Sequence, residues 1–129
     1  MVKKIVKSNN APAPIGPYNQ AILAGQTLYV SGQIAIDPQT GLMIDKSIEA
    51  ETEQVMQNIK AVLHAADLDF INVVKTSIFL SDMNSFVKVN EVYGSYFTAD
   101  FPARETIAVK TLPKNANVEI SVIAVKLDS

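Results

Sequence analysis

Two of the charged side chains in segments predicted to be β-strands are candidates for chemistry. Arg104 begins one expected strand two residues after Pro102, and Glu119 lies between Val118 and Ile120 in the last one. Strand alternation puts Arg104 on the face opposite to Glu105, so the neighbouring carboxylate cannot simply neutralise the guanidinium. A partly buried carboxylate without a partner has a raised pKa, so Glu119 could act as an acid or a base. The spacing also fits an ordinary edge arginine and a glutamate at the rim of a sheet.

Two polar residues have neighbours that could aim them into a pocket. Asn90 occupies one position of the apolar stripe expected on a helix over residues 85–98, where a buried amide must find hydrogen-bond partners. Tyr18 follows residues 11–17, which contain three prolines and form a stiff, non-helical loop. The alternatives are an amide that ties down a loop and a tyrosine that packs in the core or in an interface.

Most familiar catalytic groups are absent from the sequence. There is no cysteine, and the single histidine, His64, is expected on the surface beside the apolar stripe of the first helix. No second histidine or close carboxylate pair completes a metal site. The glycines fit turns and strands rather than a phosphate loop, and no nucleophile elbow accompanies His64. We therefore expect neither a metal nor a cofactor.

The elements that must position these residues follow from hydrophobic periodicity and turn residues. The expected strands cover residues 3–7, 18–24, 27–36, 73–80, 104–110 and 117–126, and the expected helices cover residues 49–66 and 85–98. Ser47 is the expected cap of the first helix, and Asp82 or Asn84 that of the second. Two helices cannot coat both faces of six strands, so we predict an α+β fold with a mixed six-strand sheet and both helices on one face.

Length and composition limit the protein's organisation. The 129 residues fit one domain covering residues 1–129, with a composition that is 48% hydrophobic and only 19% charged. So little charge predicts that the open face of the sheet packs against other copies of the chain. The net charge of -2 and the lack of a basic stripe argue against nucleic acid as the main partner. No signal core or membrane span is found, so a cytoplasmic location is expected and no membrane partner is.

Short motifs in order along nearly the whole chain resemble the reactive intermediate deaminase family, also called Rid or YjgF. They are Asn10-Ala11-Pro12, Ile15-Gly16-Pro17-Tyr18, Val30-Ser31-Gly32-Gln33-Ile34, Gln57-Asn58-Ile59-Lys60, Val73-Val74-Lys75-Thr76, Val89-Asn90-Glu91-Val92-Tyr93, Phe101-Pro102-Ala103-Arg104, Leu112-Pro113-Lys114 and Val118-Glu119-Ile120.

The resemblance implies a chorismate mutase-like fold in which three subunits join their sheets into a barrel with pockets at the interfaces. It implies hydrolysis of 2-imino acids, such as 2-iminopropanoate and 2-iminobutanoate, to 2-keto acids and ammonia, without a cofactor. Arg104 would bind the substrate carboxylate and Glu119 would position the attacking water. The substrate-binding residues would be Tyr18, Gly32, Phe86, Asn90 and Thr106, with Gly32 and Thr106 acting through backbone groups.

One position departs from the family pattern. A small residue often follows the arginine in the family, whereas Glu105 follows it here. By strand alternation Glu105 lies on the opposite face from Arg104, so it bears on substrate preference more than on the reaction.

Two other classes of function remain open at this point. The same pocket would serve a non-catalytic protein that binds small carboxylates and regulates a partner. RNA cleavage or inhibition of translation, attributed to some relatives, is the other.

Overall fold

The computed structural model describes residues 2–127 and contains one six-stranded sheet and two α-helices. The strand order is β1-β2-β3-β6-β4-β5, and neighbouring strands are antiparallel except for the parallel pair β4 and β5. The predicted α+β fold with a mixed sheet is therefore confirmed. The elements are β1 (Lys3–Val6), β2 (Ala21–Ala24), β3 (Thr27–Gln33), α1 (Ile48–Ala65), β4 (Val73–Leu80), α2 (Phe86–Gly94), β5 (Ala103–Ala108) and β6 (Val118–Val125).

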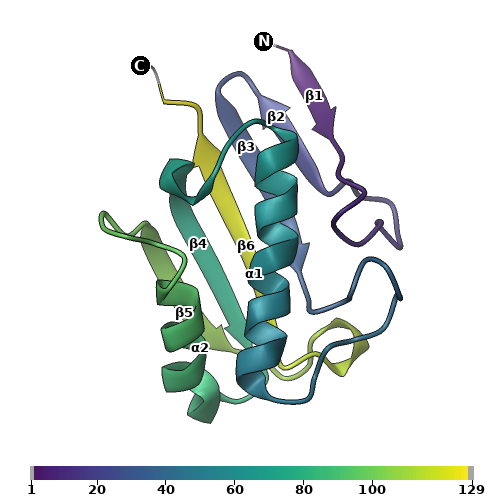
Figure 1. Ribbon diagram of the computed structural model, residues 1–129, viewed down its shortest axis with the longest axis vertical. Helices are drawn as coiled ribbons and strands as arrows, with labels where there is room; N and C mark the ends of the chain where they lie inside the picture. Colours follow the sequence, from purple (N-terminus) through teal and green to yellow (C-terminus); the bar gives the residue numbers. More distant parts are fainter. Residues whose placement is uncertain (1, 128–129) are drawn as a thin grey trace.

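Both helices lie on the same face of the sheet, as Figure 1 shows. The predicted stripe of α1 is buried between this helix and the sheet, where Val55, Met56, Ile59, Val62 and Leu63 are fully inaccessible. The core between sheet and helices is thus built from one stripe of α1 and the inward side of each strand. No helix within residues 2–127 is long and apolar enough to cross a membrane.

The opposite face of the sheet carries no helix (Figure 1). Strand pairing sets Ile5, Ile22, Tyr29 and Ile123 opposite one another in a row across β1, β2, β3 and β6. Ile5 and Tyr29 are each about half exposed. We call this side the open face. Glu119 also lies on it, because β6 alternates buried and half-buried residues and Glu119 is one of the half-buried ones.

The turn predictions near α1 and in the first half of the sheet are confirmed. The Ser47 hydroxyl accepts a hydrogen bond from the backbone N–H of Ala50 at 3.0 Å, as expected for the cap of α1. Gly25, between β2 and β3, has a φ of 61°, and Gly41 has a φ of 76°, values that suit glycine in tight turns.

Three predicted boundaries are wrong. Helix α2 ends at Gly94 rather than at residue 98, since Phe97 turns back to pack edge-on against Phe70 with 5.5 Å between ring centroids. The second strand begins at Ala21, so Tyr18 lies in the loop before it. The third strand ends at Gln33, which still pairs with Ile120 of β6 after a register shift between Val30 and Gln33.

The expected cap of the second helix is also corrected. The Asp82 carboxylate accepts from the backbone N–H of Asn84 and so caps a short 3-10 turn, Met83–Ser85, that leads into α2. Ser85, the residue before α2, provides no side-chain cap of its own.

Candidate functional site

Arg104 lies on β5, the edge strand, and is held by neutral groups. Its Nη1 donates to Asn90 Oδ1 at 2.7 Å, and its guanidinium carbon lies 5.7 Å from the Phe86 ring centroid and 5.2 Å from that of Tyr93. Within residues 2–127, no carboxylate forms a salt bridge with Arg104. Asn90 and the two rings therefore orient the guanidinium and leave its charge available to an outside anion.

Tyr93 is a member of this group that the sequence analysis did not assign to the site. Its hydroxyl donates to the buried Thr76 Oγ1 at 2.9 Å, and burial raises the pKa of this phenol. Tyr93 shares the stripe of α2 with Phe86 and Asn90, and that shared stripe was the signal that could have identified it. A cavity of about 490 Å³ opens here, between Asn90, Tyr93, Phe101 and Arg104.

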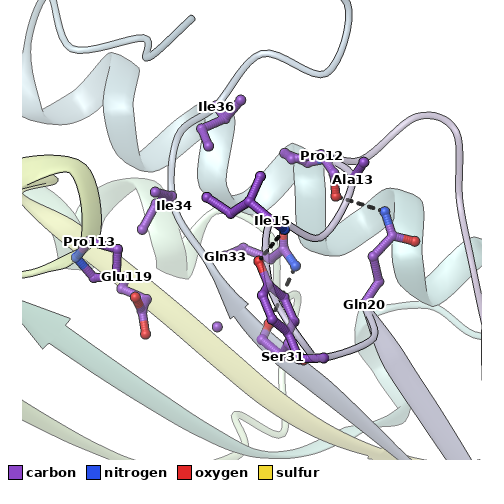
Figure 2. Close-up of a pocket in the computed structure, with 12 residues that line it drawn as sticks. Pro12, Ala13, Ile15, Gln20, Ser31, Gln33, Ile34, Ile36, Pro113 and Glu119 are labelled. Carbon is purple, nitrogen blue, oxygen red and sulfur yellow. Dashed lines mark hydrogen bonds between the residues drawn. The ribbon is translucent and has the colours of Figure 1, made fainter. Parts of the chain in front are cut away.

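Glu119 lines a second cavity, of about 400 Å³, shown in Figure 2. Most of its wall is apolar and comes from three segments: the proline-rich loop, the chain after β3 and the turn before β6. Burial raises the pKa of the Glu119 carboxyl above its ordinary value of 4.5, and no basic group pairs with it among the described residues. The lining residues are Pro12, Ala13, Ile15, Tyr18, Gln20, Ser31, Gly32, Gln33, Ile34, Ile36, Pro113 and Glu119.

Tyr18 contributes its ring to this second cavity from the proline-rich loop. The side chain is half exposed, and its hydroxyl accepts a long hydrogen bond, 3.4 Å, from the backbone N–H of Ile15. The sequence analysis expected the proline-rich loop to aim Tyr18, and its ring indeed lines the same cavity as Glu119.

The Glu119 carboxylate occupies the position that a side chain at Gly32 would fill. A Cβ placed on Gly32 would lie 2.5 Å from Glu119 Oε2 and 2.9 Å from Cδ, inside the contact distance of non-bonded atoms. Any side chain at position 32 would therefore displace the carboxylate. The sequence analysis assigned Gly32 through its backbone only and missed this steric role.

We expect Gly32→Ala to push the Glu119 carboxyl toward solvent and bring its pKa back toward 4.5. The carboxyl is the end of a flexible side chain, so the overpacking should cost no more than about 1–3 kcal/mol of stability. The measurement is an NMR titration of the Glu119 carboxyl carbon in both proteins, with circular dichroism as the control for folding. An unchanged pKa would show that Gly32 does not set the position of this group.

Two further residues of β5 lie on opposite sides of the strand. Thr106 faces the same side as Arg104, and its hydroxyl oxygen is buried without a hydrogen-bond partner in the described chain. Glu105 lies on the open face, where it accepts from the Ser77 hydroxyl and pairs with Lys75 at 2.9 Å. These partners lower the pKa of the Glu105 carboxyl. The predicted separation of Glu105 from Arg104 is thus present.

The predicted site residues therefore form two groups in one protomer. Arg104, with Phe86 and Asn90, lies on the helix side of the edge strand. Tyr18, Gly32 and Glu119 line the other cavity, which borders the open face. A small molecule cannot touch both Arg104 and Glu119 of the same protomer, because the body of the sheet separates them.

Glu53, Gln57 and Tyr96 form a further hydrogen-bonded cluster, which is exposed on the surface. Within residues 2–127, no three His, Asp or Glu side chains are arranged to hold a metal ion. The side chain of His64 is about half exposed and lies 3.5 Å from the Asp69 carboxylate on the surface of α1.

Comparisons with known proteins identify a family and relatives that match nearly the whole chain. Residues 8–126 match the model of the family described as Endoribonuclease L-PSP. The chain is 46% identical to the 2-iminobutanoate/2-iminopropanoate deaminase of Bos taurus over 126 residues, covering 98% of this chain and 92% of that protein.

Two solved structures show how closely the backbone is shared. A protein of the conserved Rid family from Yersinia pestis is 47% identical, with a TM-score of 0.94 over 97% of this chain and 100% of that one. Escherichia coli TdcF, solved with bound serine, is 36% identical, with a TM-score of 0.92 over 96% of this chain and 99% of that one.

Proposed function

The chain belongs to the Endoribonuclease L-PSP family, which contains the Rid proteins, and from this premise we propose that it is a 2-imino acid deaminase. The substrates would be reactive imines such as 2-iminopropanoate and 2-iminobutanoate. Water converts them to the corresponding 2-keto acids and ammonia. The name of the bovine relative supports this substrate class, and the serine bound to Escherichia coli TdcF supports a site for a small molecule.

The observation that carries the proposal is a pair of charged groups without protein partners. Within residues 2–127, Arg104 is oriented by an amide and two aromatic rings but pairs with no carboxylate, and the half-buried Glu119 pairs with no cation. Half burying the Glu119 carboxylate without a partner costs stability unless a ligand uses the group. A 2-imino acid supplies an anion for the guanidinium and, at the adjacent carbon, an electrophile for a water held by the glutamate.

The chemistry then needs only positioning and proton transfer. Arg104 binds the substrate carboxylate through two N–H groups and so fixes the plane of the imine. Glu119 accepts a proton from water as the oxygen bonds to the imine carbon, giving a tetrahedral adduct that carries both oxygen and nitrogen. The same carboxyl returns this proton to nitrogen, which gives a neutral adduct with one hydroxyl and one amino group. It then takes the proton of the hydroxyl as the carbon–oxygen double bond forms, and passes it to the amino nitrogen as the carbon–nitrogen bond breaks, so that ammonia leaves. Backbone groups of Thr106 on β5 and of Gly32 on β3 would contact the imine or keto end of the substrate.

The site is complete only when two copies of the chain meet. Arg104 lies at the free edge of β5, whereas the Glu119 cavity borders the open face. A neighbouring protomer that covers the open face would bring its Arg104 to this cavity. Closed rings of three repeat this one contact three times. The exposed apolar row through Ile5 and Tyr29 supports such packing.

We expect the protein to run as a trimer at micromolar concentration, because burial of the apolar open face stabilises the assembly. Light scattering after gel filtration measures the mass. Tyr29→Glu, which puts a charge on that face away from both cavities, should weaken the trimer, whereas Val87→Glu on the exposed side of α2 should not. A monomeric wild-type protein would contradict the shared site.

Two other functions fit the fold, but no specific feature of the structure favours either. The endoribonuclease in the family's name would need groups for phosphate chemistry, yet the net charge is -2 and His64 faces Asp69. A carboxylate-binding regulator would use the same cavity without turnover.

The test of the proposal is ammonia release from freshly generated 2-iminobutanoate, with and without the protein. The imine also hydrolyses in water alone, so the protein must raise the rate above that background. Equal rates, together with saturable binding of 2-oxobutanoate, would instead identify a binding protein.

A further inference from the structure

Three buried polar side chains are hydrogen-bonded to the segments that form the walls of the Glu119 cavity. Asn58 of α1 is fully buried, and its Nδ2 donates to the carbonyl oxygens of Ile34 at 3.1 Å and Ile36 at 3.0 Å. Both isoleucines line the cavity. The amide of Asn58 thus fixes the wall that follows β3.

Glu51, also fully buried on α1, fixes the turn before β6. Its carboxylate accepts from the backbone N–H of Asn117 at 2.7 Å, from Asn117 Nδ2 at 2.8 Å and from the backbone N–H of Val118 at 3.2 Å. Glu119 is the next residue along the chain. The base of the Glu119 side chain is therefore held from the helix layer, on the other side of the sheet.

Gln20 fixes the third wall, the proline-rich loop. Only 4% of this residue is exposed. Its Oε1 accepts from the backbone N–H of Ser8 at 2.7 Å, and its Nε2 donates to the carbonyls of Ser8 at 3.0 Å, Ala11 at 3.3 Å and Pro12 at 2.9 Å. The bond to Pro12 is drawn in Figure 2.

Among the described residues 2–127, residues 11–17 of the proline-rich loop form no other hydrogen bond to the body of the protein. Its three prolines have no N–H to donate, and the remaining bonds of residues 11–17 in the described chain, Tyr18 N–H to Gly16 and Ile15 N–H to the Tyr18 hydroxyl, are internal to the loop and Tyr18. Ala11 is buried, but Ala13, Ile15 and Tyr18, which line the cavity, are exposed or partly so. One amide therefore carries the polar attachment of residues 11–17, whereas the chain just after Tyr18 is held by the Ser31 hydroxyl, which donates to the Asn19 carbonyl at 2.6 Å.

We propose that Gln20 is a positioning residue that sets substrate affinity by holding the proline-rich loop and Tyr18 over the Glu119 cavity. Gln20 acts through the loop, at its carbonyls, and not on the reacting atoms. Asn58 and Glu51 hold the other two walls, which are the segment after β3 and the turn before β6. Both residues are fully buried on α1, where substitution disturbs folding as well. Gln20 is the member of the three whose role can be separated from folding. The kinetic part of this proposal depends on the proposed deaminase activity, and the structural part does not.

The test compares Gln20→Met with Thr52→Val. Methionine keeps the length and burial of Gln20 but makes none of its four hydrogen bonds. Thr52 is a matched control because it is equally buried and its hydroxyl donates only to Ile48 within α1, at 2.7 Å. Methyl NMR reports the order of Ala13 and Ile15 in the proline-rich loop, with the exposed Ile71 as a reference far from it.

In Gln20→Met, the Ala13 and Ile15 methyl groups should lose order while Ile71 is unchanged. KM for 2-iminobutanoate should rise about tenfold, with kcat within about twofold, because a loosened wall weakens binding of substrate and transition state alike. Thr52→Val should change neither the order of the Ala13 and Ile15 methyl groups nor KM. Ordered Ala13 and Ile15 methyls in Gln20→Met, or the same rise of KM in Thr52→Val, would overturn the proposal. If wild-type protein releases no ammonia, the deaminase proposal fails, and the NMR comparison still decides whether Gln20 holds the loop.

Discussion

Arg104→Lys is expected to lower kcat/KM for 2-iminobutanoate almost as far as Arg104→Ala does. Lysine keeps the charge but offers a point contact, so it loses the planar fork that fixes the substrate carboxylate and the imine carbon beside it. It also loses the stacking on the rings of Phe86 and Tyr93. Truncating one partner of a desolvated charge pair costs about 2–5 kcal/mol. At ~1.4 kcal/mol for each factor of ten, kcat/KM should fall roughly 30-fold to several thousand-fold.

Folding should be little affected by either substitution of Arg104. The side chain is exposed and bonded to Asn90 alone, so its removal leaves no buried charge behind. Melting temperature and trimer mass are the controls. Full activity in Arg104→Lys would show that the arginine supplies only electrostatic attraction, and an unfolded Arg104→Ala would make it a structural residue.

Glu119→Gln is expected to lower kcat by about 100-fold or more while 2-oxobutanoate still binds. The amide keeps the shape of the side chain but cannot take up a proton from water, and general acid–base catalysis contributes about 100-fold to 10,000-fold. The measurements are kcat from steady-state kinetics and the Kd of the product by calorimetry. An unchanged kcat would leave Glu119 a structural residue.

The pH dependence of the wild-type enzyme follows from the same carboxyl. Burial raises the pKa of Glu119, and the general base must be ionised, so kcat/KM should fall on the acid side at a pH above 4.5. The folded state binds this proton more tightly than the unfolded state, so the contribution to stability is present at low pH and lost as the pH rises through the raised pKa. Glutamine does not ionise, so Glu119→Gln does not lose stability as the pH rises through this pKa. The variant should therefore be at least as stable as wild type at pH 7.

The sequence predicted the layers of the fold well because one helix stripe and alternating strands were unambiguous. It failed where tertiary contacts decide the outcome. The end of α2 depends on Phe97 packing against Phe70, and the pairing of β3 with β6 shifts register between Val30 and Gln33. Neither feature follows from local periodicity. The prolines predicted that Tyr18 has a defined direction, but its place in the loop before β2 did not follow from the sequence, and its pocket role was implied only by the family resemblance.

In the candidate site, too, local sequence patterns predicted some features, whereas others depend on the tertiary structure. Alternation along β5 was enough to put Arg104 and Glu105 on opposite sides, and the half-buried position of Glu119 followed from its neighbours in the sequence. The separation of Arg104 from Glu119 could not be predicted, because it depends on strand order and on which face each residue occupies. The role of Gln20 was also hidden, because its partners are backbone carbonyls that no residue type reveals.

A mixing experiment tests the shared site most directly. Arg104→Ala and Glu119→Gln are each expected to be nearly inactive. Equal amounts are unfolded and refolded together, so that trimers of both variants form at random. A site built from Arg104 of one protomer and Glu119 of its neighbour is then intact in about a quarter of cases. The account predicts recovery of about a quarter of the ammonia-release rate of wild-type protein refolded in the same way. No recovery, with active refolded wild type and mixed trimers confirmed by mass, would contradict it.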